Sequence, residues 1–159
     1  MRLLLLLPFL LLMAACETTP VQPAPGQALI KPAAVTFYVI HETPGPNLTE
    51  RKVEATGETI LLGAQPDLTN SDVAWAEMAM DRFSTRSLVL VHFSPVGADK
   101  LAALTRQNIG RRLAILVSSR VIATPLITTE IRDGRLTIQG FRSPGEARWV
   151  ADSLARWLR

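Results

Sequence analysis

The sequence is poor in the residues that build cross-links and metal sites. Its 159 residues include one cysteine and two histidines. A single thiol excludes an intramolecular disulfide framework, and the same count excludes a zinc site of the finger type. The hydrophobic fraction of 48% excludes a collagen-like or wholly disordered chain. The length favours one domain.

The sequence also lacks an apolar run long enough to cross a bilayer. The run Leu3–Met13, interrupted only by Pro8, has about half of the roughly 20 residues that a spanning helix needs, which is the length of a signal-peptide core. The segment Leu12–Cys16 (LMAAC) resembles the bacterial lipobox, in which the cysteine becomes the first mature residue and carries acyl chains such as palmitate. We therefore expect residues 1–15 to be a lipoprotein signal peptide and Cys16 to be lipidated. The alternative is ordinary secretory cleavage beside an incidental cysteine.

Residues 16–34 differ in composition from the rest of the mature chain. They contain four prolines, at positions 20, 23, 25 and 32, and proline favours an extended, solvated backbone. We expect this segment to be a tether. The protein is then exported and held on the cell membrane or the outer membrane, facing the periplasm, and the sequence leaves the choice of membrane open.

Charge is distributed unevenly along the chain. From Cys16 to Arg82 there are four basic and nine acidic residues, a balance of −5, whereas from Phe83 to the end there are twelve and five, a balance of +7. A basic half can bind nucleic acid or anionic lipid. These arginines are scattered, without a tight run or interleaved aromatic residues, so we predict no nucleic-acid partner. Attraction to anionic headgroups close to the tether stays open.

Residues 35–159 carry the pattern of a folded domain. Runs of β-branched, aromatic and aliphatic residues predict strands at 35–40, 58–63, 87–93, 113–117, 120–124 and 136–140. Four consecutive apolar residues within 87–93 indicate a central strand that is covered on both faces, or a long strand packed by a helix. The Asp133–Gly134 pair between apolar flanks predicts a hairpin.

Capping residues predict where helices begin. Helices are expected after Thr69–Asp72, where apolar residues recur at helical spacing from Val73 to Phe83, after Ser94–Pro95, and after Ser143–Pro144. Together the elements predict an α+β fold, a single two-layer domain with a mainly antiparallel or mixed sheet of roughly five to six strands and about three helices.

Residues able to do chemistry are few and dispersed. His41 and His92 lie at or within predicted strands, and Glu42 and Glu130 lie near strand ends, without the spacing of a metal or catalytic motif. There is no G-x-S-x-G, no phosphate-binding glycine loop and no H-E-x-x-H. We therefore predict a protein that is not an enzyme and needs no cofactor or metal. An enzyme that uses His41 or His92 is the alternative.

Two residues are candidate partner contacts. Trp149 lies off the apolar stripe of the last predicted helix, beside arginine, as on recognition surfaces; the alternative is that it folds back over a neighbouring loop. Pro125 cannot donate to a sheet ladder and marks an edge or a bulge, where a partner could add a strand.

Several spaced motifs in the second half of the chain occur in a fixed order. They are Thr105–Ile115 (TRQNIGRRLAI), Val121–Ile127 (VIATPLI), Ile138–Phe141 (IQGF) and Glu146–Ala147, with Gln65–Thr69 upstream. This series resembles the head part of the large first periplasmic domain of the SecD or SecDF protein-export subunit, and the resemblance covers most of residues 60–158.

The resemblance implies the head fold and, as a hypothesis, contact with exported polypeptides. It implies fold-determining roles for Asn108, Gly110, Pro125 and Gly140. The turn Ser118–Ser119 departs from the Asp-Gly usual in that family. The membrane residues that serve proton-driven export there have no counterpart in these 159 residues, so we do not expect motor activity to carry over.

The sequence therefore favours a non-catalytic, lipid-anchored binding module of the cell envelope that contacts exported or unfolded polypeptides. The alternative is a structural or regulatory subunit of a larger envelope complex. The client and the oligomeric state are not readable from the sequence.

Overall fold

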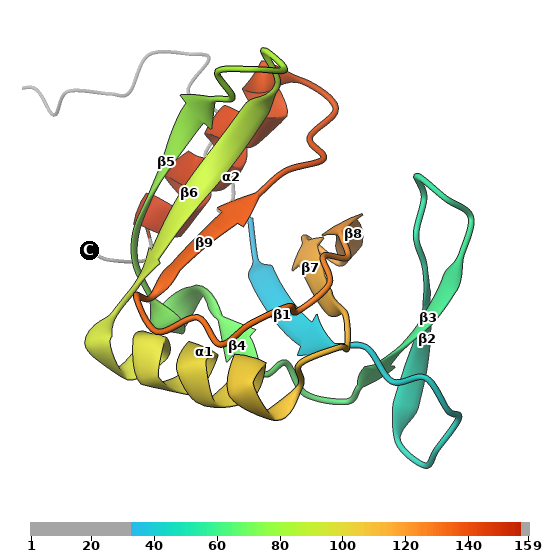
Figure 1. Ribbon diagram of the computed structural model, residues 1–159. Coiled ribbons are helices and arrows are strands. Elements are labelled where there is room, and N and C mark those ends of the chain that lie inside the picture. The colour runs from blue at the N-terminus through green and yellow to red at the C-terminus, as the bar shows by residue number, and fades with distance from the viewer. Residues whose placement is uncertain (1–32, 157–159) are drawn as a thin grey trace, which may run out of the picture. The chain divides into compact units, whose positions relative to one another are not determined.

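The computed structural model describes residues 33–156 (Figure 1). The predicted signal peptide, Cys16 and nearly all of the predicted tether lie outside these residues. Within the described part the chain forms nine strands, two α-helices and one short 3-10 helix, arranged as three antiparallel sheets. The α+β class is confirmed, although the strand count differs: the strands are more numerous than the five to six expected and are divided among three sheets. No helix in this part is long and apolar enough to cross a membrane.

The first sheet has the order β4–β1–β7–β8, with β4 at Leu68–Thr69, β1 at Val35–Val39, β7 at Leu113–Val117 and β8 at Arg120–Ala123. All five residues of β7 are buried because both faces of this strand are covered. Leu113, Ile115 and Val117 belong to the main core, whereas Ala114 and Leu116 belong to a second, smaller cluster. The uninterrupted apolar run of β7 is explained by this double cover.

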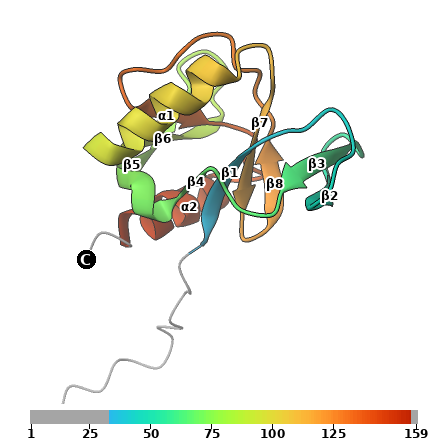
Figure 2. The same cartoon turned by 90° about the horizontal axis from the view of Figure 1, so that it is seen from below.

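The smaller cluster lies beneath a two-stranded hairpin formed by β2 (Leu48–Lys52) and β3 (Thr59–Gly63). Its members are Ile40, Val53, Ile60, Leu62, Ala114, Leu116 and Val121, with Tyr38 packed against them. Figures 1 and 2 both show this hairpin on the side of the first sheet that is away from β5 and β6. The sequence patterns predicted no strand between residues 40 and 58, and β2 corrects this: its exposed, mostly polar residues gain strand structure by pairing with β3.

The third sheet has the order β5–β6–β9, with β5 at Val73–Met80, β6 at Ser87–Phe93 and β9 at Arg135–Ile138. Helix α2 (Pro144–Arg156) packs on one face of this sheet, against β5 and β6. Ala147, Val150, Ala151 and Leu154 of α2 join the main core together with Val89 and Val91 of β6. The apolar stripe predicted for this helix is therefore the surface that it buries.

Helix α1 (Pro95–Gln107) begins as its sequence predicts. The Ser94 hydroxyl accepts a hydrogen bond from the Gly97 amide at 3.1 Å, and proline occupies the first turn. Gly97 packs so closely on the 3-10 turn Asn70–Asp72 that a Cβ atom there would lie 2.0 Å from the Asp72 carbonyl oxygen. The helix ends at Gln107, just before Gly110, which has a φ of 86°.

The helix predicted over Val73–Phe83 was wrong, because this segment is strand β5. The predicted capping box does form at Thr69–Asp72, but it opens only the three-residue 3-10 turn. Alanine, methionine and glutamate favour helix intrinsically. Here that preference is overridden because β5 pairs along its length with β6 and is covered by α2.

The hairpin predicted at Asp133–Gly134 was also wrong. Gly134 adopts a φ of 64° and the Asp133 carboxylate accepts a hydrogen bond from the Arg135 amide, so the pair does make a turn. The next strand, β9, pairs with β6 rather than with the segment before the turn. Local turn chemistry alone could not reveal this partner, which lies more than forty positions away in the sequence.

Candidate functional site

One face of the β5–β6–β9 sheet is left bare by the described elements. Val89, Val91 and Phe93 of β6 point into the main core. Successive side chains of a strand point to opposite faces, so Leu88, Leu90 and His92 point away from it. Figure 1 views the sheet from this side, with α2 behind it and no element in front. This surface, which we call the open face, is the strongest candidate for a functional site.

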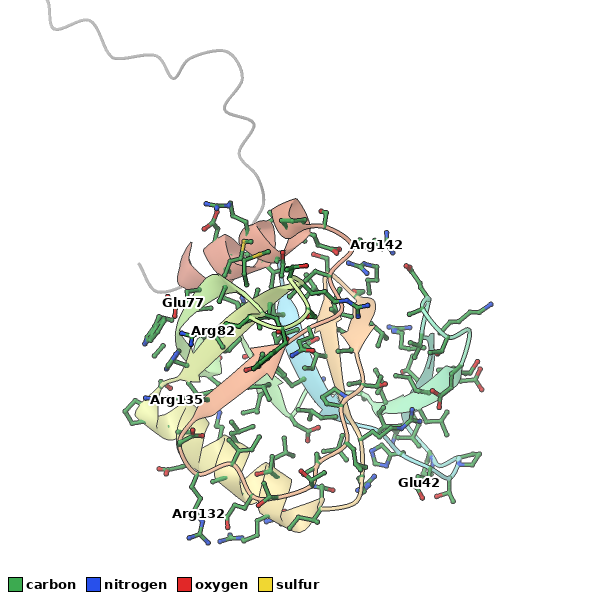
Figure 3. The ribbon with its side chains drawn as sticks, turned by 45° about the horizontal axis from the view of Figure 1, so that its top comes forward. Glu42, Glu77, Arg82, Arg132, Arg135 and Arg142 are labelled. Carbon is green, nitrogen blue, oxygen red and sulfur yellow. The ribbon has the colours of Figure 1, made fainter. Side chains whose placement is uncertain are left out.

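The register of the three strands arranges the open face in rows. One row runs from Trp75 through His92 to Arg135, and the next from Glu77 through Leu90 to Thr137. A third row pairs Ala79 with Leu88. The centre of the face is therefore apolar, with one acidic and one basic residue at opposite edges. Figure 3 shows Glu77 and Arg135 on the same side of the molecule, well away from Arg142.

Trp75 and His92 form a stacked pair on this face. Their ring centroids lie 3.6 Å apart and the rings are inclined by only 10°. The indole is still 43% exposed, because nothing in the described residues covers its other side. Cross-strand pairs on one face of a sheet stabilise each other, and this stack leaves the flat indole of Trp75 partly exposed to a partner.

Of the two expectations for residues 87–93, the structure agrees with a long strand packed by a helix and not with cover on both faces. β6 is central in its sheet, but only the face that carries Val89 and Val91 is buried in the described structure. Leu88 and Leu90 remain partly exposed. Apolar residues beyond the need of the core are a common mark of a contact surface.

Sequence reasoning missed Trp75 because its segment was interpreted as a helix. A signal for the open face was nevertheless present. In a strand, Trp75, Glu77 and Ala79 alternate with the core-facing Ala76 and Met78, and the run SLVLVHF supplies apolar residues at successive positions. A strand with leucine on the face opposite its buried valines needs either a second cover or a partner.

Trp149 does not lie on the open face. It is partly buried on α2, where it packs against the main core, and its carbonyl oxygen accepts a hydrogen bond from the Ser153 hydroxyl at 2.7 Å. The packing is against the core, whereas the structural alternative had expected the ring to fold over a neighbouring loop. A role in recognition has no direct support here and stays a prediction.

Pro125 lies just beyond β8, which is an edge strand of the first sheet. Its carbonyl oxygen accepts a hydrogen bond from the Leu113 amide at 2.9 Å, and the β7–β8 register shifts at Ile115/Leu116. With Leu126, Ile131 and other residues it lines a small, mostly apolar pocket of about 110 Å³, and Trp149 is not among the lining residues. The structure does not bring the two candidate contacts into one pocket.

The two histidines occupy different sites. His92 stacks on Trp75, whereas His41 makes an isolated β-bridge to Leu61 and lines a cleft of about 260 Å³ with Glu42, Glu58 and Arg112, among others. The described residues contain no group of three or more His, Cys, Asp or Glu side chains placed to hold a metal.

The cleft of His41 is closed on one side by an ion pair. Arg112 donates to both carboxylate oxygens of Glu58, at 2.9 and 2.5 Å. The hydrogen bond from Arg112 lowers the pKa of Glu58, and Glu58 in turn raises the pKa of the Arg112 guanidinium. This pair links the β2–β3 hairpin to the start of β7, which is a structural task.

Three further carboxylates, those of Glu130, Glu146 and Glu54, are also paired with arginine. Glu130 bonds Arg132 at 2.8 Å, which lowers the pKa of Glu130, and Figure 3 shows Arg132 and Glu42 on opposite sides of the molecule. Glu42 and Glu130 therefore do not form a carboxylate pair. A further cleft, of about 320 Å³, is lined by residues including Arg120 and Arg142, which form ion pairs with Glu146 and Glu54. Burial lowers the pKa of Arg120.

Comparison with known families gives one consistent result. The model of the SecDF P1 head subdomain matches residues 47–156 of this chain. The protein translocase subunit SecDF of Thermus thermophilus is 43% identical over 86 residues, which cover 54% of this chain and 12% of that protein. The protein translocase subunit SecD of Acidaminococcus fermentans is 30% identical over 118 residues, 71% of this chain and 28% of that protein. The chain therefore spans well under a third of either relative.

Solved structures agree with the sequence relatives. A structure described as that of a membrane component SecDF that enhances protein export superposes with a TM-score of 0.66 at 29% identity, over 84% of this chain and 70% of that chain. SecDF in a super-membrane-facing form superposes with a TM-score of 0.64 at 32% identity, over 78% of this chain and 19% of that chain.

Proposed function

Because this chain belongs to the family of the SecDF P1 head subdomain, we propose that it is a non-catalytic binding module of the cell envelope that contacts exported polypeptides in their unfolded state. Its relatives are named as protein translocase subunits. The chain matches only a small part of them, so the proposal concerns binding alone and not the activity of a whole translocase.

The observation that carries the proposal is the open face of the β5–β6–β9 sheet. An unfolded polypeptide exposes apolar side chains, and the stacked Trp75 ring with Leu88 and Leu90 offers an apolar surface of matching character. Both β5 and β9 are edge strands among the described elements. An extended segment could therefore hydrogen-bond to a strand edge while its side chains rest on the face.

A binding assay with an unfolded protein tests this proposal. The mature chain, residues 16–159, carrying Cys16→Ser is titrated against reduced, carboxymethylated α-lactalbumin, which cannot fold, and the dissociation constant is measured by fluorescence anisotropy. We expect Trp75→Ala to weaken binding by about tenfold or more, the usual effect of removing a central aromatic contact. Val96→Ala is the matched control, since Val96 is an apolar residue that is 65% exposed at the start of α1, outside the three strands that form the open face.

Binding that Trp75→Ala leaves unchanged would contradict the proposed site. If the wild-type chain does not bind the unfolded protein but crosslinks to one folded envelope protein, the result would instead support a role as a structural or regulatory subunit of an envelope complex. If His41→Ala loses binding while Trp75→Ala binds as the wild type does, the binding site is instead the cleft beside β3.

We further propose that Cys16 anchors this module to a membrane through acyl chains. The support is the lipobox-like sequence, in which the single cysteine of the chain comes directly after an apolar core and two alanines. Two or more acyl chains hold a protein stably on a bilayer. Mass spectrometry of the mature amino terminus should find an acylated Cys16, and Cys16→Ser should release the protein from membranes. An unmodified terminus would contradict the anchor without touching the binding proposal.

A further inference from the structure

The turn between β5 and β6 presents a phenylalanine that has no role in the fold. Phe83 is 99% exposed, the largest exposure among the large hydrophobic residues of the described chain, and Met80 at the end of β5 is 52% exposed. Figure 1 shows this turn at the top of the view, at the end of the two strands that is farthest from α1. We call residues Met80–Ser87 the tip.

The tip holds Phe83 outward by a set of local hydrogen bonds. The Asp81 carboxylate accepts from the amides of Phe83 and Ser84, at 2.7 and 3.0 Å. The Asp81 backbone closes the turn on both sides, donating to the Arg86 carbonyl and accepting from the Thr85 amide. These amide donors lower the pKa of Asp81, so its carboxylate is charged at neutral pH. These hydrogen bonds therefore define the conformation of the turn in which Phe83 is exposed.

Thr85 gives a second sign that the shape is specified. Its φ of 54° lies in the left-handed region, which is unfavourable for a β-branched residue. The Thr85 hydroxyl donates to the Ser84 carbonyl at 2.7 Å, which is one local compensation. A backbone outlier held in place by local bonds is frequent at binding sites.

Charge at the tip is positive. Arg82 and Arg86 flank the exposed ring, and neither belongs to an ion pair found among the described residues. Elsewhere Arg111 bonds to Asn108 and to the Ile40 carbonyl, and Arg112 bonds to Glu58. The tip therefore combines the most exposed aromatic ring of the described residues with two arginines that belong to none of their ion pairs.

From this combination we propose that the tip docks on an anionic membrane surface, with Phe83 entering the interface and Arg82 and Arg86 contacting lipid headgroups. A ring flanked by arginines suits the boundary between headgroups and acyl chains, where the apolar and charged parts are both satisfied. A folded protein partner would hold its carboxylates in fixed positions that the two arginines would have to match. Mobile anionic headgroups can instead move to meet two flexible guanidinium groups.

This contact goes beyond the proposed binding of polypeptides and does not depend on it. The open face and the tip are separate surfaces, because Trp75 and Phe83 lie at different places along the β5–β6 hairpin. A single ring and two arginines bind weakly by themselves. For a chain already anchored at the membrane the same contact becomes intramolecular, and its effective concentration rises accordingly.

Vesicle partitioning tests the proposal. The mature chain, residues 16–159, with Cys16→Ser is mixed with vesicles of phosphatidylglycerol and phosphatidylcholine in equal amounts, or of phosphatidylcholine alone, and floated on a density gradient. We expect partitioning onto the anionic vesicles only, weakening as salt rises. Phe83→Ala should lower the partition coefficient about tenfold, and Arg82→Gln and Arg86→Gln about fivefold each. Val96→Ala should change nothing, and all variants share the same N-terminal segment.

A label at the tip provides a second readout. Because Cys16 is the single cysteine, the pair of changes Cys16→Ser and Ser84→Cys allows one nitrobenzoxadiazole probe beside Phe83. Its fluorescence should rise with anionic vesicles, whereas the same probe at Ala55→Cys, in the β2–β3 turn, should not respond. Equal partitioning of Phe83→Ala and wild type overturns the proposal. The proposal is also overturned if the tip variants no longer bind unfolded α-lactalbumin but still bind vesicles.

Discussion

Two sheets of this molecule contain similar apolar strands but differ in how many of their faces are covered. The β4–β1–β7–β8 sheet is covered at β7 on both faces, by the main core and by the small cluster beneath the β2–β3 hairpin. The β5–β6–β9 sheet is covered on one face by α2 and left open on the other. The apolar run of β7 is therefore buried on both faces, whereas the apolar run of β6 leaves one face exposed. The sequence of a strand alone does not show how many of its faces are covered.

The largest expected difference comes from the same substitution in the two sheets. Leu116→Ala in β7 removes a side chain that is only 3% exposed, and should lower the free energy of unfolding by about 2–4 kcal/mol through lost burial and the cavity left behind. Leu90→Ala on the open face should cost less than about 1 kcal/mol, because Leu90 is already partly exposed. Urea unfolding measures both, and equal losses would show that the two sheets do not differ in cover.

A tryptophan on each side of the β5–β6–β9 sheet separates stability from binding. Trp149→Ala, on the covered side, should lower the free energy of unfolding by about 1–3 kcal/mol and leave polypeptide binding unchanged, since the ring packs on the core. Trp75→Ala should cost under about 1 kcal/mol, the range of a cross-strand pair, while weakening binding. Thermal unfolding and anisotropy on the same samples distinguish the two effects. The reverse pattern would restore Trp149 as the recognition residue.

The smallest expected effect is a pH titration at the tip. The folded-state pKa of Asp81 is depressed below its ordinary value of 3.8, first by the Phe83 amide and then by the Ser84 amide. Its contribution to stability is therefore complete above that ordinary value and is lost as the pH falls through the depressed one. The amide proton shifts of Phe83 and Ser84 should stay constant from neutral pH down to the ordinary value and move only in stronger acid. A midpoint above 3.8 would mean that the turn does not hold Asp81 as described.

The sequence predicted the covered sheet better than the open one. Strands β1 and β7 were predicted from alternating or continuous apolar residues, and the resemblance located the family from motifs centred on α1, β7 and β8. The β5 segment could not be assigned in this way, because helix-favouring residues there form a strand only through pairing with β6. Trp75 was missed for that reason, and Phe83 was counted among the apolar residues at helical spacing in a predicted helix that does not form.

Glycine illustrates what local reasoning could and could not anticipate. Gly140 was expected to matter for the fold, and its φ is 97°, with the Ile122 carbonyl oxygen 2.8 Å from the place that a Cβ atom would occupy. The resemblance indicated the residue. The reason for it, a close approach between the segment after β9 and strand β8, is a tertiary contact that one-dimensional patterns do not contain.

Binding of unfolded polypeptide on the open face of the β5–β6–β9 sheet can be tested by site-specific crosslinking. A photoreactive benzoyl-phenylalanine placed at Thr137, on the open face, is compared with the same residue at Thr49, exposed on the β2–β3 hairpin. After irradiation with reduced, carboxymethylated α-lactalbumin, we expect crosslinks from position 137 and none from position 49. Crosslinks from position 49 alone, or equally from both, would contradict the proposed binding surface.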